Sequence, residues 1–98
     1  MNKRSIHVVL LVIEIFIPYA ESLKSKRSVI KGLQERLRAR FNASVAEISY
    51  QDEWQRSAIG VSILSNDKQY LEKEISHIRQ LCEEIRDVEM VQFNQEWL

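Results

Sequence analysis

Few residues in this chain are of types that carry out acid–base, nucleophilic or metal chemistry. The two histidines, His7 and His77, have no cysteine or carboxylate at metal-ligand spacing. Cys82 lies on the apolar side of a helical repeat, where a buried thiol is far more common than a nucleophile. Glu14 and Glu47 form a carboxylate pair only if their strands are neighbours, which the predicted topology excludes. With no glycine-rich phosphate loop either, the sequence predicts no enzyme activity, metal or cofactor.

A basic helix offers different chemistry, the binding of phosphate groups. The candidate contacts on this predicted helix are Lys24, Arg27, Lys31, Arg36, Arg38 and Arg40. On a helical projection four of them fall within about 60° of one another, whereas Arg36 and Arg40 flank the apolar stripe on its other side. Such cations bind nucleic-acid backbones and release counterions. The alternative is a solvated outer face that pairs with acids of a second helix.

The turn QDEWQR, residues 51–56, is the second candidate site. Trp54, beside Gln55 and Arg56, is placed to stack on a base or to anchor a protein contact. The alternative is that the indole packs over the end of the sheet while Arg56 pairs with Asp52 or Glu53. Trp54 and Arg56 therefore join the predicted nucleic-acid-binding residues.

Charge is unevenly distributed along the 98 residues, although the total is zero. Residues 1–41 hold nine Lys/Arg against three acids, net +6, and residues 42–98 hold five against eleven, net −6. A composition that is 45% hydrophobic and 29% charged is typical of one globular domain. The lone cysteine fits a reducing compartment.

The N-terminal apolar run, residues 6–17, is read as a buried central strand. A secretory signal is the alternative, but Glu14 interrupts the apolar region, and the run is too short to span a bilayer. We therefore expect a cytoplasmic protein with no membrane contact.

Hydrophobic periodicity supplies the remaining elements. A stripe at Val29, Ile30, Leu33, Leu37 and Phe41 predicts a helix over about 25–41, capped by one of two serines and followed by Asn42, which tolerates a left-handed conformation. Residues 44–50 and 56–64 alternate like strands. A helix opened by Asn66 and Gln69 carries the next stripe, and residues 88–93 form a last strand.

This βαββαβ order favours one domain, residues 1–98, with a four-stranded antiparallel sheet and two helices on one face. We expect residues 1–5 and 94–98 to be flexible or peripheral. Half of the first strand's apolar side chains then face the uncovered side of the sheet, which favours a homo-oligomer through that open face or an edge strand. The alternative is that the tail with Trp97 and Leu98 covers the patch.

Residues 21–64, ESLKSKRSVIKGLQERLRARFNASVAEISYQDEWQRSAIGVSIL, resemble the YlxP-like family of small bacterial proteins of unknown function. With the apolar first strand, the resemblance covers about two thirds of the chain. It implies a ferredoxin-like fold and a genomic setting among translation and ribosome-maturation factors. The resulting hypothesis is a non-catalytic protein that binds ribosomal RNA or the ribosome; the alternative is a homo-oligomeric protein-interaction domain without nucleic-acid binding.

Overall fold

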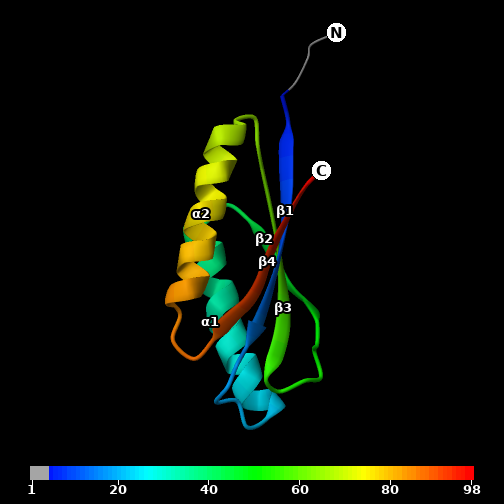
Figure 1. Ribbon diagram of the computed structural model, residues 1–98, viewed down its shortest axis with the longest axis vertical. Coiled ribbons are helices and arrows are strands. Elements are labelled where there is room, and N and C mark those ends of the chain that lie inside the picture. Colours follow the sequence, from blue (N-terminus) through cyan, green and yellow to red (C-terminus); the bar gives the residue numbers. More distant parts are fainter. Residues whose placement is uncertain (1–4) are drawn as a thin grey trace.

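A computed structural model describes residues 5–98, and its element order is βαββαβ (Figure 1). The six elements are β1 (His7–Phe16), α1 (Leu23–Arg40), β2 (Ser44–Ser49), β3 (Arg56–Ser65), α2 (Lys68–Glu84) and β4 (Glu89–Trp97). The expected strands and helices are all present. Residues 1–4, part of the segment expected to be peripheral, lie outside the described residues.

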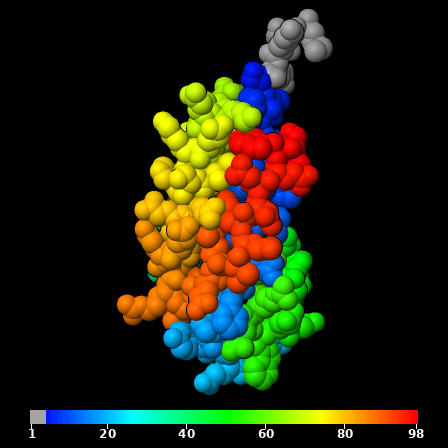
Figure 2. All heavy atoms as spheres, viewed as in Figure 1, coloured from blue at the N-terminus to red at the C-terminus, as the bar shows by residue number. Residues whose placement is uncertain are grey.

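The four strands form one antiparallel sheet in the order β2-β3-β1-β4. Both helices lie on one face of this sheet, to its left in Figure 1, and the other face has no helix over it. This arrangement confirms the ferredoxin-like split βαββαβ fold. It makes β1 and β3 the central strands and β2 and β4 the edges, with β4 running along the surface beside α2 (Figure 2).

The core lies between the sheet and the helices. In β1 the alternate residues Val9, Leu11, Ile13 and Ile15 are fully buried, because they face the helices. The residues between them point to the open face and are only partly covered. As the sequence indicated, half of the apolar side chains of this strand therefore face the uncovered side of the sheet.

Serine caps the start of α1. The hydroxyl of Ser22 accepts from the Ser25 backbone N–H, and the Ser25 hydroxyl accepts from the Ser22 N–H, so two otherwise unpaired donors are satisfied. At the other end Phe41 is extended, with φ −130°. The left-handed ending suggested by Asn42 is therefore wrong: the described non-glycine residues with positive φ are Tyr50 and Asp87.

The start of α2 lies one residue later than the sequence indicated. Asp67, not Asn66, is the N-cap, and its carboxylate accepts from the Tyr70 N–H at 3.2 Å. Either short polar side chain suits this position. The hydroxyl of Ser65 also accepts from the Asp67 N–H, a bond within the turn that leaves β3.

The last strand is longer than the predicted 88–93 and includes residues 94–97. Its pairing with β1 carries a bulge opposite Glu14 and Ile15 and then continues in regular register to Trp97, opposite Val9. Trp97 consequently faces the helix side, where it packs against the core beneath the Lys68 ammonium group. The tail therefore forms an edge strand and does not fold over the open face.

Across residues 5–98, neither helix combines the length and the apolar character that a bilayer crossing requires.

Candidate nucleic-acid interface

The exposed cations of α1 lie on both sides of a buried stripe. This stripe packs against the sheet and so determines the rotation of the helix about its own axis. Lys26, Ile30, Leu33 and Leu37 are the buried residues, and they face the sheet. The six predicted contacts are all solvent-exposed; they are Lys24, Arg27, Lys31, Arg36, Arg38 and Arg40. All six side chains are therefore accessible to a partner in solution.

Four of these cations follow the flank of α1 that faces β2. The guanidinium of Arg38 donates to the Val45 carbonyl at 2.7 Å, which places this flank beside the edge strand. Lys24, Arg27 and Lys31 lie on the same flank by helical periodicity. From Lys24 to Arg38 the row is about 21 Å long, at 1.5 Å per residue. We call these four residues the basic row.

Arg36 and Arg40 lie on the opposite flank of α1. Arg36 lines a groove of about 150 Å³ together with Ile85, Arg86 and Asp87, which connect α2 to β4. The structure therefore separates the predicted contacts into two groups on either side of the helix. A single nucleic-acid strand lying along the basic row would not reach Arg36 and Arg40 at the same time.

Few acids oppose these charges. Within the described residues, Lys24, Arg27, Arg36 and Arg40 take part in no ion pair. Lys31 lies 4.0 Å from Glu35, but both side chains are largely exposed, so the pair contributes little. Three acids of α2, Glu74, Glu83 and Glu84, bond within their own helix, as Glu83 does with Arg79 at 3.0 Å. No ion pair joins α1 to α2 in residues 5–98, contrary to the alternative in which the two helices neutralise each other.

Arg56 is held by a different partner from those considered in the sequence. Its Nε donates to Glu14 at 2.7 Å, and its guanidinium lies 4.0 Å from the centre of the Tyr50 ring. The hydrogen bond to Glu14 raises the pKa of Arg56. Pairing with Asp52 or Glu53 is therefore wrong: Arg56 pairs with Phe16 in the sheet, so it reaches Glu14 on the same face. Arg56 is less available to phosphate than the cations of α1.

Trp54 lies in the turn between β2 and β3 with 53% of its surface exposed. The turn is tied to the start of α1, since the Gln55 amide donates to the Pro18 carbonyl at 3.0 Å. Trp54 is therefore at the Lys24 end of the basic row, roughly 24 Å along the helix from Arg40. Its neighbours Asp52 and Glu53 are exposed acids, which weaken phosphate binding there. Base stacking by Trp54 stays a prediction.

Sequence reasoning missed a buried polar trio beneath α1. Lys26 is 1% exposed, and its ammonium group lies 3.0 Å from Glu47 while it donates to the Tyr50 carbonyl. Glu47 also accepts from the hydroxyl of Ser57, which is fully buried. The signal was present: Lys26 lies at the centre of the stripe formed by Ile30, Leu33 and Leu37. Glu14, by contrast, is on the open face, so the two carboxylates do not meet.

The trio holds the chain in place. Both Lys26 and Ser57 are inaccessible to solvent, so they do not present a nucleophile to a substrate. Instead, Lys26 secures Tyr50, which has a positive φ of 65° that an L-residue adopts at a cost. The ring of Tyr50 in turn supports Arg56.

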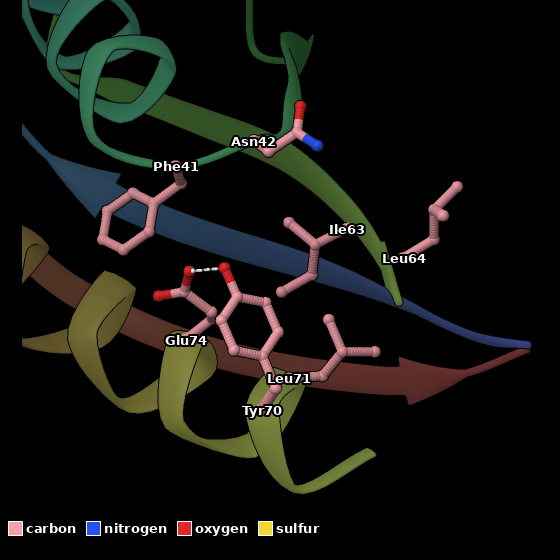
Figure 3. Close-up of a pocket in the computed structure, with 7 residues that line it drawn as sticks. All are labelled: Phe41, Asn42, Ile63, Leu64, Tyr70, Leu71 and Glu74. Carbon is pink, nitrogen blue, oxygen red and sulfur yellow. Dashed lines mark hydrogen bonds between the residues drawn. The ribbon is translucent and has the colours of Figure 1, made fainter. Parts of the chain in front are cut away.

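The residues first considered for chemistry have ordinary structural environments. Burial raises the pKa of the Cys82 thiol to about 11, which suppresses the thiolate. His77 is exposed and lies 3.6 Å from Glu74. A cavity between β3 and α2 measures only about 40 Å³, enough for about one water molecule. Figure 3 shows Tyr70 in this cavity, with its hydroxyl donating to Glu74 at 2.6 Å, a bond that raises the pKa of Tyr70.

Comparison with known proteins identifies the family. The family model described as "Protein of unknown function (DUF503)" matches residues 8–95, which include both the basic helix and the Trp54 turn. An uncharacterized protein of Bacillus subtilis (strain 168), YlxP, is 36% identical over 78 residues, which is 80% of this chain and 85% of the relative. These matches confirm the YlxP-like resemblance, and the chain belongs to the DUF503 family.

Proposed function

We propose that this protein is a non-catalytic RNA-binding protein that contacts phosphates through the basic row of α1. The observation that carries the proposal is the charge balance of that helix. Six exposed cations accompany one acid, Glu35, and five of the six make no ion pair within residues 5–98. An outer helix surface that only meets water usually mixes both signs of charge.

The shape of the row favours backbone contact over reading of base sequence. The basic row is straight and about 21 Å long, a length that spans several phosphates of a strand. Four phosphate contacts give a slope of about −3 to −4 for the logarithm of affinity against the logarithm of salt concentration. We therefore expect binding that weakens strongly with salt and depends little on sequence.

The family setting among translation and ribosome-maturation factors, implied by the resemblance, makes ribosomal RNA the first RNA to test. Purified protein is sedimented with separated ribosomal subunits over a series of salt concentrations. The test variant is Lys24→Glu/Lys31→Glu, because both side chains are exposed and Lys24 makes no ion pair in the described chain. Arg38 is unsuitable for this test because it also bonds to Val45.

A matched control changes the net charge equally at another surface. Lys73→Glu/Arg86→Glu also reverses two exposed cations, but on α2 and on the turn after it. We expect the α1 variant to lose binding by at least about tenfold and the control to stay close to wild type, since each phosphate contact is local. Equal losses of affinity in both variants would show that binding depends on the net charge of the protein and not on α1. If the wild-type protein does not bind at low salt, the proposal is refuted.

A second candidate, a protein-interaction domain without nucleic-acid binding, is favoured by the uncovered face of the sheet. If this candidate is correct, neither the wild-type protein nor the α1 variant binds RNA. The sedimentation experiment therefore separates the two candidates.

A further inference from the structure

The face of the sheet that carries no helix has an unusual composition for a solvated surface. We call it the open face; its central residues are Val8, Leu10, Val12, Ile48, Gly60 and Ser62. The outer face of an antiparallel sheet normally carries polar residues that alternate with the apolar core residues. Here β1 places a valine, a leucine and a valine on the outer side. Contact between the centre of this face and water is therefore energetically unfavourable.

Charge is confined to the margin of the open face. At one end Arg56 and Glu14 neutralise each other. The other charged side chains of this face are Glu89 and Glu96, on the edge strand β4, as their pairing with Phe16 and Leu10 shows. Because 29% of the residues in this chain are charged, a surface region without any charged side chain is unusual for it. The uncharged centre excludes phosphate as the occupant of this face.

The surface of the open face has both a shallow pocket, which we call the hollow, and a projecting side chain. Gly60 and Ser62 are small, and the hollow above them holds about 230 Å³, with Leu10 and Ile48 among its walls. Ile48 leans over Gly60, so that a Cβ there would lie 3.1 Å from its Cγ2. Leu64 projects beside the hollow with 67% of its surface exposed, and in Figure 3 it points away from Ile63 and Leu71.

These features point to one occupant, a second copy of this chain. We infer that two molecules pack open face to open face about a two-fold axis, with the sheets about 10 Å apart and the helices outside. A neutral centre with both a hollow and an apolar projection meets its own copy without like-charge repulsion. The basic row remains accessible, because α1 is on the opposite side of the sheet.

The available area is sufficient for such a dimer. The four strands have 10, 6, 10 and 9 residues at about 3.3 Å each, and each strand covers about 4.8 Å of width. The face therefore measures roughly 550 Å² per copy, and burying it twice gives about 1,100 Å², just above the area of about 1,000 Å² that a specific interface needs. A small molecule in the hollow would leave most of this apolar surface in water.

The test is the mass of the purified chain, measured by sedimentation equilibrium over a wide range of protein concentration. We expect a species of twice 11.6 kDa that persists at high salt, because an apolar interface is not screened. Two variants place a charge on the open face, Ser62→Arg in the hollow and Leu64→Lys beside it. Each should raise the dimer dissociation constant at least about a hundredfold, since symmetry buries the new charge twice and each copy costs at least tenfold.

The matched control is Tyr19→Lys, which places the same charge on an exposed aromatic residue of the β1–α1 loop, away from the open face. It should dimerise like wild type. Circular dichroism and urea unfolding test whether the variants are folded, and Leu64→Lys should remove little of the monomer's packing because the side chain is mostly exposed. A wild-type monomer at every concentration overturns the inference. A dimer that both open-face variants leave intact overturns it too, and would point to pairing through a strand edge.

Discussion

Replacing Lys26 with methionine tests the buried trio most directly. The methionine retains the apolar stem of the lysine but removes the ammonium group, which is 1% exposed and lies 3.0 Å from Glu47. Breaking a buried ion pair costs about 3–5 kcal/mol, because the remaining charge is left without its partner. Glu47 is 19% exposed and keeps its bond from Ser57, which places the loss near the lower limit, at about 3 kcal/mol.

The lost hydrogen bond to the Tyr50 carbonyl adds about 1 kcal/mol. Lys26→Met should therefore lower the free energy of unfolding by about 3–4 kcal/mol, a large part of the 5–15 kcal/mol typical of a domain. Urea unfolding followed by circular dichroism measures this difference. The variant should remain folded without denaturant but unfold at a much lower urea concentration.

A double-mutant cycle with Glu47→Gln isolates the charge pair. The glutamine can still accept from Ser57, but it has no charge that needs Lys26. We expect Lys26→Met/Glu47→Gln to be about 1–2 kcal/mol more stable than Lys26→Met alone, because no unpaired carboxylate is left in the core. A loss below about 1 kcal/mol for Lys26→Met, or single-variant losses that simply add, would refute this account of the trio.

Three further predictions follow from individual contacts. Leu11→Ala, at a fully buried position in the central strand, should cost about 3–5 kcal/mol in urea unfolding, because a cavity forms where no neighbour can collapse. Ser22→Ala removes the α1 cap and should cost about 1 kcal/mol by the same measurement; an equal loss for an exposed Ser76→Ala would argue against capping as the cause. Cys82, with its pKa raised to about 11, should react with a thiol reagent at pH 8 many times more slowly than the unfolded chain. Because an unfolded thiol ionises near pH 9, the folded state should also lose stability as pH rises from about 9 to 11, and rapid labelling of native protein would contradict the burial.

Local patterns were sufficient to predict the fold. Ile59, Val61 and Ile63 alternate with small residues, and this period of two identified β3 and its inner face. The stripe of Ile30, Leu33 and Leu37 identified α1 in the same way. Errors occurred where two neighbours were chemically equivalent, as with Asn66 and Asp67 at the start of α2.

The site was less predictable because it depends on contacts distant in the sequence. Arg56 and Glu14 are 42 residues apart, and only the pairing of β1 with β3 brings them together. Lys26 was hidden by its residue type, since a lysine within a basic helix suggests an exposed cation. Its place among buried leucines and isoleucines was the better indicator, because position on the helix decides burial before side-chain charge does.

The position of β1 in the sheet also affects how the chain matures during synthesis. Both strands that flank β1 are made after it: β3 begins at Arg56 and β4 at Glu89. The most apolar segment of the chain is therefore translated before both of its neighbours, and it cannot gain its first hydrogen-bonded strand until β3 is complete at Ser65. At about 5–20 residues per second this interval lasts several seconds, during which an unpaired strand is prone to aggregation. We expect molecular chaperones that bind apolar nascent segments to recognise β1, and the yield of native protein to depend on how quickly β4 follows.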